Sequence, residues 1–301
     1  MGCGPSPQDL RGTYCGTGFG PGPARPSGYD QIVYEEQFDD SLFPANLSRI
    51  SGLGFPAPAD PSAELQTYRP ENVSVVHGPV GDDHAMLGAM SIHATWDTAA
   101  NQFFSGMIVS SATHCPMQTS RAADSCSGSS WGTGTNFATT PNQGVFVEIC
   151  AKMPLIGGNW PALWILRDDG SEHWPPELDL VEIFPTRPKP MCQTQIYGDV
   201  VRPLDDQVCV PDDPNRFHSY GVLWDPATGK VEFRLDGVRV PMPDTAGFWA
   251  DAAKMGSPAY FIANNALSSV TAGDFPSAQG ESEMLIDYVR VFTNGPQLVR
   301  H

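Results

Sequence analysis

The sequence predicts an all-β fold, a sandwich or barrel of antiparallel strands, and two observations carry this prediction. Short runs of alternating or β-branched apolar residues recur along the chain, each ended by Gly, Pro, Asn or Asp. The 30 glycines and 29 prolines make up about a fifth of the 301 residues, and such dense turn chemistry leaves little room for long helices. At 41% hydrophobic residues, the chain can also bury one sizeable core.

The expected strands follow one another along the chain without an internal repeat. They are the segments 31–38, 71–78, 85–95, 106–112, 144–153, 162–168, 177–184, 218–225, 230–240, 259–267 and 284–292. Asp236-Gly237 interrupts one of these runs and predicts a hairpin turn there.

These runs define the expected domain. Residues 1–28 are rich in Gly and Pro and poor in apolar side chains, which predicts an N-terminal tail that a disulfide could hold. One domain is expected over residues 29–294, and residues 295–301 are expected to form a C-terminal tail.

The charge balance argues against two classes of partner. Lys and Arg number 17 against 34 Asp and Glu, and a net charge of -17 repels phosphate backbones and anionic lipid headgroups. No apolar run approaches the roughly 18 residues that a membrane span requires. We therefore expect a soluble monomer that binds neither nucleic acid nor membrane.

Seven cysteines indicate an oxidising compartment, and hence a secreted, extracellular protein, although no signal peptide is visible in this chain. The expected short-range pairs are Cys3 with Cys15, Cys115 with Cys126, and Cys192 with Cys209. Cys150, in an apolar run, is expected to be a buried free thiol. A zinc cluster is not expected, because the sequence has no C-x-x-C and no histidine pair at ligand spacing.

Three carboxylates, Glu177, Asp179 and Glu182, interrupt the otherwise apolar run WPPELDLVEIF. Burying charge in such a strand is costly unless the groups line an open face or share protons. Side chains alternate along a strand, so Glu177 and Asp179 share one face while Glu182 would point to the other. A β-bulge within Leu180-Val181 would return Glu182 to the first face. The sequence therefore predicts a bulged strand with all three carboxylates on one surface.

The spacing of these groups favours a retaining glycosidase. With the bulge, the Cα atoms of Glu177 and Glu182 stand about 13 Å apart, and their side chains can close most of that gap. Retaining enzymes place two carboxyls about 5 to 5.5 Å apart, and inverting enzymes about 6.5 to 9.5 Å. Asp179, beside a glutamate, would share a proton or a hydrogen bond and split the pKa values of the cluster.

Tryptophans surround the acids. Trp160, Trp164 and Trp174 precede Glu177 closely, and aromatic faces are common platforms for sugar rings. The alternatives are core packing for each ring and a solvated strand of scattered charges for the acids. The combination favours a sugar-binding cleft. His218 and the pair Asp205-Asp206 are expected in solvated loops.

In these motifs the chain resembles glycoside hydrolase family 16, the clan of laminarinases, lichenases, agarases and carrageenases. The resemblance runs from about Tyr34 to Phe292 through EEQF, ELQTYRPENVSVVHG, FSGMIVSS, GVFVEICAKMPLIGGNWPALWIL, WPPELDLVEIF, FHSYGVLWDP and MLIDYVRVF. It implies a β-jelly-roll sandwich of two antiparallel sheets with a concave substrate cleft. The two residues between Asp179 and Glu182 make the motif similar to that of laminarinases and agarases rather than lichenases.

The resemblance also implies roles for single residues. Glu177 corresponds to the nucleophile, Asp179 to its assisting acid, and Glu182 to the acid/base of a double displacement. The residues implied in substrate binding are Trp160, Trp164, Trp174, Asn72 and Tyr197. No cofactor is required, and the family implies an optional structural calcium ion with Asp287 as its carboxylate ligand.

Three departures from the family pattern alter the expected cleft walls. The family's T-L-H-Y-G is TQIYG here, with Ile196 in place of histidine, and S-G-R-I is SGMI, with Met107 in place of arginine. The late Gly- and Trp-containing loop is replaced by ANNALSSVTAGDFPSA. The resemblance therefore implies a retaining endo-β-glycosidase acting on a polysaccharide, with β-1,3-glucan of the laminarin type favoured. The alternatives are a glucan-binding protein without turnover, an agarase- or carrageenase-type enzyme, and a transglycosylase.

Overall fold

The structure is a computed structural model. It describes residues 15, 25–40, 42–53, 64–77, 88–112, 116, 126, 128–130, 132–135, 137, 144–167, 176–199, 202–225, 230–242, 259–268 and 281–295.

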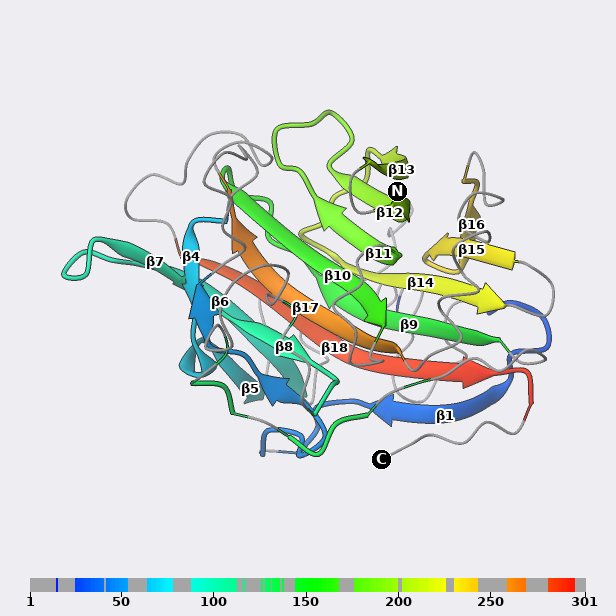
Figure 1. Cartoon of the computed structure of the whole chain (residues 1–301), viewed down its shortest axis with the longest axis horizontal. Helices are drawn as coiled ribbons and strands as arrows, with labels where there is room; N and C mark the ends of the chain where they lie inside the picture. Colours follow the sequence, from blue (N-terminus) through cyan, green and yellow to red (C-terminus); the bar gives the residue numbers. More distant parts are fainter. Residues whose placement is uncertain are drawn as a thin grey trace, which may run out of the picture.

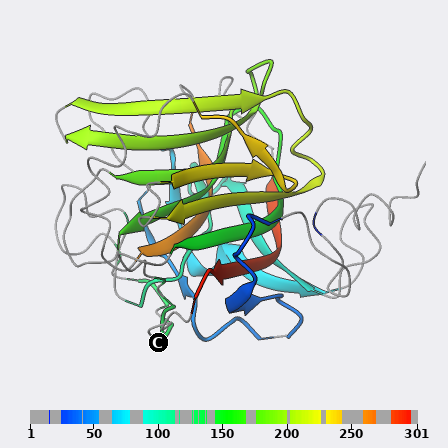
Figure 2. The same ribbon diagram turned by 90° about the vertical axis from the view of Figure 1, so that its right-hand side faces the viewer.

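The predicted all-β fold is confirmed, because the described residues form two sheets that pack face to face (Figures 1 and 2). The larger sheet follows the order β16-β15-β14-β9-β18-β6-β7-β4-β3, with β1 paired to β18 and β5 paired to β6. The smaller sheet follows the order β13-β12-β11-β10-β17-β8-β2. Apart from the parallel pair β4 and β7, these strands run antiparallel to their neighbours.

The larger sheet consists of β1 (Gln31–Glu36), β3 (Gly52–Leu53), β4 (Gln66–Tyr68), β5 (Val73–His77), β6 (Gly88–Asp97), β7 (Gln102–Ser105), β9 (Val145–Lys152), β14 (Phe217–Asp225), β15 (Lys230–Leu235), β16 (Val238–Val240) and β18 (Ser282–Thr293). The smaller sheet consists of β2 (Ser48–Arg49), β8 (Met107–Val109), β10 (Asn159–Arg167), β11 (Glu177–Ile183), β12 (Met191–Asp199), β13 (Arg202–Val210) and β17 (Ala259–Leu267). One 3-10 turn, η1 (Pro70–Asn72), precedes β5. The strands that were not among the segments expected from the sequence are β2, β3, β4, β7, β12 and β13.

The main core lies between the two sheets. Val147 and Ile149 of β9 pack in the same buried cluster as Leu163 and Ile165 of β10. The spacing of these pairs is the two-residue period of strands, so alternate side chains of each strand face the core and the others face outward. The outward face of the smaller sheet is the one that carries the expected carboxylates.

The disulfides confirm one expected pair and correct two expectations. Cys192 and Cys209 are bonded, as predicted. Cys15 is bonded to Cys150, not to Cys3, so Cys150 is not a free thiol. The reason is alternation along β9, because Ile149 and Ala151 face the core while Cys150 faces the outer side of the larger sheet, where Cys15 packs. Cys126 is also disulfide-bonded, and its expected partner Cys115 lies outside the described residues.

In the described part of the chain, no helix has the length and apolar character needed to cross a membrane.

Candidate active site

Strand β11 sends its apolar side chains inward and its acids outward. Leu178 and Ile183 are fully buried in the cluster between the sheets. Glu177 and Glu182 are half-buried on the other face, and Asp179 is 2% exposed. The strand therefore anchors the carboxylates by burying the residues between them.

The predicted bulge is present. Pairing with β12 is regular up to Asp179 and resumes at Glu182, so Leu180 and Val181 oppose the single residue Gln193. Gln193 Nε2 donates to the carbonyl oxygen of Leu180 at 2.9 Å, and so pairs a backbone acceptor inside the irregular segment. The extra residue turns Glu182 back to the face of the other two acids.

The surroundings of Asp179 change its titration. Burial, and then the charges of Glu177 and Glu182, raise the pKa of Asp179 well above its usual range, and a hydrogen bond with Glu177 acts in the same direction. Asp179 Oδ2 has no hydrogen-bond partner among the described residues. A protonated Asp179 donates to Glu177 and removes one negative charge from the cluster.

Two neighbours hold the carboxyl of Glu182. Trp160 Nε1 donates to Oε1 at 3.1 Å, and Thr194 Oγ1 donates to Oε2 at 2.9 Å. Donors therefore contact both oxygens and restrict the orientation of the Glu182 carboxyl. The separation of the Glu177 and Glu182 carboxyls stays a prediction.

The three predicted tryptophans differ in placement. Trp160 is half-buried, with its ring centroid 6.2 Å from that of Phe184, and it contacts Glu182 through its N–H. Trp164 is only 8% exposed, packs in a cluster with Tyr68, and donates to Asn264 Oδ1 at 2.8 Å. Packing covers most of the ring, although Trp164 pairs with Asp179 across the strands and shares its face. Its expected contact with substrate stays a prediction. Trp174 lies outside the described residues.

Tyr197 is also placed differently from the expectation. In β12, Thr194 and Ile196 pair with the acidic residues of β11, and alternation turns Tyr197 to the opposite face. There the ring packs against the main core, and its hydroxyl donates to Asp206 Oδ2 at 3.0 Å. Tyr197 therefore does not share the surface of the carboxylates.

Asn72 lies at the end of η1. Its Nδ2 donates to the carbonyl oxygen of His93 at 3.2 Å, in β6 of the larger sheet. Its expected contact with substrate stays a prediction.

Asp287, the implied calcium ligand, is half-buried in β18 where pairing with β9 is irregular between Ile286 and Tyr288. Among the described residues, the group of three ligand-type side chains close enough to share an ion does not include Asp287. The calcium site stays a prediction.

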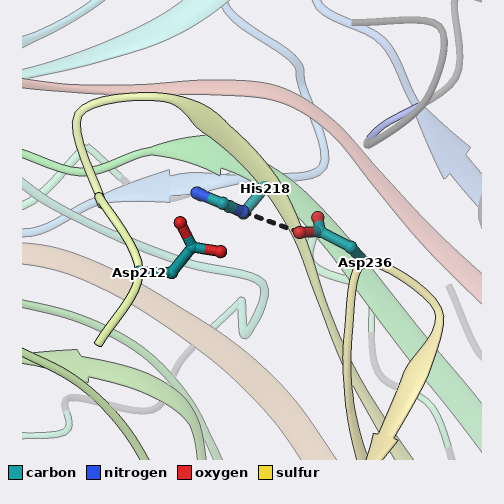
Figure 3. Close-up of side chains that lie close together, drawn as sticks. All are labelled: Asp212, His218 and Asp236. Atoms are coloured by element: carbon teal, nitrogen blue, oxygen red, sulfur yellow. Dashed lines mark hydrogen bonds and ion pairs between the residues drawn. The ribbon is translucent and has the colours of Figure 1, made fainter. Parts of the chain in front are cut away.

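That group is Asp212, His218 and Asp236, whose ligand atoms lie within 4.8 Å of one another (Figure 3). His218 is fully buried, which corrects its expected place in a solvated loop. Its Nδ1 lies 2.8 Å from Asp236 Oδ2, and its Nε2 lies 2.9 Å from the carbonyl oxygen of Asp213. Both partners are acceptors, so both ring nitrogens donate and neither keeps a lone pair for a metal. The geometry fits a buried, hydrogen-bonded charge cluster.

Sequence reasoning missed the polar residues that extend the site across the sheet. Thr194 of β12 pairs in register with Gln207 of β13, next to the bonded pair Cys192 and Cys209. A signal for this was available, because the predicted disulfide fixes the register of an antiparallel pair, and that register sets Thr194 opposite Gln207.

A two-sheet sandwich with three clustered carboxylates on one bulged strand defines a class, the glycoside hydrolases that work with a carboxylate pair. Residues 95–290, well over half of the chain, match the family described as "Glycosyl hydrolases family 16". The chain belongs to this family.

Two curated relatives from Rhizobium meliloti (strain 1021) are similar to this chain. "Endo-1,3-1,4-beta-glycanase EglC" is 31% identical over 166 residues, which is 54% of this chain and 32% of the relative. "Endo-1,3-1,4-beta-glycanase ExsH" is 32% identical over 163 residues, with the same two shares. The chain therefore spans about a third of the length of these two relatives.

Solved structures resemble the whole sandwich. The laminarinase catalytic domain from Thermotoga maritima MSB8 superposes with a TM-score of 0.60 at 22% identity, over 87% of this chain and 97% of that one. A family 16 endo-glucanase from Bacteroides ovatus gives 0.62 at 18% identity, over 86% and 100%. At these identities the likeness establishes the jelly-roll fold.

Proposed function

We propose that this chain is a retaining endo-β-glucanase that hydrolyses a polysaccharide, β-1,3-glucan of the laminarin type first, by double displacement. The observation that carries the proposal is the cluster on β11, where a bulge gathers Glu177, Asp179 and Glu182 on one face and two donors hold Glu182. Family membership supports the same reaction class.

In the first step, Glu182 in its protonated form gives its proton to the glycosidic oxygen. Glu177 attacks the anomeric carbon, the carbon–oxygen bond to the leaving sugar breaks, and a glycosyl-enzyme ester forms. The pKa of Asp179 is raised by burial and by its two neighbours, so Asp179 keeps a proton that it donates to Glu177. This hydrogen bond orients the nucleophile without adding a second negative charge beside it.

In the second step, Glu182 is a carboxylate and accepts a proton from water, which attacks the same anomeric carbon. The ester bond to Glu177 breaks, the sugar leaves with its original configuration, and Glu182 regains its proton. The N–H of Trp160 and the hydroxyl of Thr194 stabilise Glu182 in the ionised form that this step begins with.

The choice between substrates rests on the walls beside the acids. Ile196 of β12 pairs with Glu177 of β11, so an apolar side chain lies beside the proposed nucleophile. The names of the two Rhizobium relatives support mixed-linkage β-1,3-1,4-glucan as the second substrate to test.

The test is hydrolysis by the recombinant chain of laminarin, mixed-linkage β-glucan, agarose and carrageenan, followed by release of reducing sugar. Glu177→Gln should abolish the release, while Glu71→Gln, which alters an exposed glutamate of η1, should leave it unchanged. NMR of the first product should show the β-anomer, and an initial α-anomer would overturn the retaining mechanism.

Two other outcomes identify the alternatives. Binding of laminarin without release of reducing sugar by the wild-type chain would replace the hydrolase by a glucan-binding protein. Products longer than the supplied oligosaccharide would identify transglycosylation. Reducing sugar released only from agarose or only from carrageenan would show that the substrate is not β-glucan.

We also propose a secreted, extracellular location. The Cys15–Cys150 and Cys192–Cys209 bonds support an oxidising compartment. Fractionation of the source cells should place the protein outside the cytosol, and recovery of reduced protein from the cytosol would contradict this.

A further inference from the structure

A line of hydrogen bonds leads from Glu182 across two strands to a cation outside the acidic motif. Thr194 Oγ1 donates to Glu182 Oε2 at 2.9 Å, and Gln207 Nε2 donates to Thr194 Oγ1 at 3.0 Å. Arg187 Nη1 donates to Gln207 Oε1 at 2.7 Å. The line therefore joins three elements: β12, β13 and the turn that connects β11 to β12.

Elementary chemistry fixes the direction of every bond in this line. A guanidinium only donates, so the amide oxygen of Gln207 faces Arg187 and its NH₂ group faces Thr194. The Thr194 oxygen accepts from that NH₂ group, and its own proton points to Glu182. All three bonds donate toward the carboxylate, which is the arrangement in which neighbouring hydrogen bonds strengthen one another.

The far end of the line is held in place. The guanidinium of Arg187 lies over the ring of Phe184, 3.6 Å from its centroid, and the backbone N–H of Arg187 donates to the Phe184 carbonyl oxygen at 3.0 Å. The Cys192–Cys209 bond joins β12 to β13 at a pair that lies two residues along each strand from the Thr194–Gln207 pair. The register that brings Gln207 to Thr194 is therefore fixed covalently.

We propose that Gln207 and Arg187, acting through Thr194, are positioning residues that hold the carboxyl of Glu182 for its two proton transfers. The inference rests on the proposed hydrolase function and adds residues outside the E-x-D-x-x-E motif to it. Trp160 fixes one oxygen of Glu182 and this line fixes the other. The line also favours the ionised carboxylate, the form needed when water attacks the glycosyl-enzyme.

A cross-strand pair such as Thr194 and Gln207 also stabilises a sheet without any part in catalysis. The experiment must therefore use readouts that stability alone does not move. Three variants interrupt the line at different points: Thr194→Val is nearly isosteric, Gln207→Ala removes the amide, and Arg187→Lys keeps the charge at an exposed site but removes the planar fork. Thr194→Ser keeps the hydroxyl and serves as the conservative rescue.

The matched control is Gln102→Ala. Gln102 of β7 donates through Nε2 to Thr67 Oγ1, so the control removes the same kind of glutamine–threonine bond in the other sheet. Unfolding of each variant is followed by circular dichroism to confirm that it folds.

On the best glucan substrate, Thr194→Val and Gln207→Ala should each lower kcat about tenfold with KM changed less than about twofold, and Arg187→Lys should lower kcat about threefold. The alkaline limb of the kcat/KM profile should move to higher pH in Thr194→Val, because the ionised carboxylate of Glu182 loses a donor. It should move by less in Gln207→Ala, because Thr194 still donates to Glu182 but is no longer oriented by Gln207. The double variant Thr194→Val with Gln207→Ala should have the same kcat as Thr194→Val alone, because both changes act through the bond from Thr194 to Glu182. Thr194→Ser and Gln102→Ala should match the wild type.

A second substrate separates positioning of the acid from loss of structure. On a dinitrophenyl glycoside of the same glucan, the leaving group needs no proton, so the defect in the first step should shrink to less than about threefold. An equal loss on both substrates with an unmoved pH profile would overturn the inference and leave a structural pair. If the wild-type chain hydrolyses neither substrate, the proposed function itself is overturned.

Discussion

Two clusters of buried titratable groups in this molecule contrast sharply, the acids of β11 and the group around His218. Asp179 is buried between two carboxylates, and one of its oxygens has no hydrogen-bond partner among the described residues. His218 is buried between acceptors that satisfy both ring nitrogens. Asp179 avoids the repulsion of its neighbours by keeping a proton, whereas the ring nitrogens of His218 donate to acceptors. The difference teaches that burial of a titratable group does not by itself mark a reactive site, because the neighbours that the group meets decide which protonation state is stable.

The largest expected effect tests the reactive side of this comparison. Glu182→Gln should lower kcat on glucan by about 10³-fold, because the amide cannot transfer a proton, while the free energy of unfolding stays within about 1 kcal/mol of the wild type. Steady-state kinetics and urea denaturation measure the two quantities. A large loss of stability with little loss of activity would mean that Glu182 has a structural role, like that of the group around His218, and not a catalytic one.

The next effect tests the structural side. His218→Gln should lower the free energy of unfolding by about 3 kcal/mol, because it removes the buried donor that faces Asp236. The matched control is His93→Gln. His93 Nε2 also lies 2.8 Å from its carboxylate partner, Glu283 Oε1, but the side chains of His93 and Glu283 are 42% and 38% exposed. That change should cost less than about 1 kcal/mol. Equal losses in the two variants would remove the distinction between them.

The pH dependence of stability sharpens the contrast. Burial by itself lowers the pKa of His218, but the hydrogen bond and charge of Asp236 outweigh it, and the pKa is raised above 6.5. The folded protein thus holds this proton more tightly than the unfolded chain, so its contribution is complete below pH 6.5 and is lost as pH rises through the raised value. Urea denaturation from pH 6 to 9 should show wild-type stability falling, and the fall should be smaller in His218→Gln. Parallel curves would contradict this assignment.

The smallest expected effect has the opposite sign. Asp179→Asn removes a group whose raised pKa makes the folded state less stable as pH rises above 3.8, so at neutral pH the variant should be as stable as the wild type or up to about 1 kcal/mol more stable. Its activity should fall about tenfold, because an amide cannot share a proton with Glu177. Stability and kinetics on one protein preparation measure both. A clear loss of stability would mean that Asp179 is held as favourably as His218.

Features set by residues close together in the sequence could be predicted, and contacts between distant segments could not. The bulge in β11 was predictable because Glu177, Asp179 and Glu182 fit one face of a strand only if one residue is inserted, and the apolar residues between them forbid the other solution. The Cys192–Cys209 pair was predictable because the two residues are close in sequence. Cys15 and Cys150 are 135 residues apart, and no local pattern connects them.

The surroundings of two aromatic residues were the other point that sequence patterns did not determine. Tyr197 was matched to a family motif, yet alternation in β12 turns it to the core side of the sheet. Trp164 lies on the expected strand but is covered by a cluster that includes Tyr68 of β4. The face of Tyr197 follows from the register of β12 with β11, and the covering of Trp164 follows from the segments that pack over it.

The sequence by itself determined the all-β class, the family and the strand that carries the acids, because alternation and the cost of burying charge act over a few neighbouring residues. Only the tertiary structure decided which donors reach Glu182, that Cys15 meets Cys150, and that His218 is enclosed. These contacts join segments far apart in the chain, and their free energy depends on packing and dielectric surroundings that exist only once the sheets have formed.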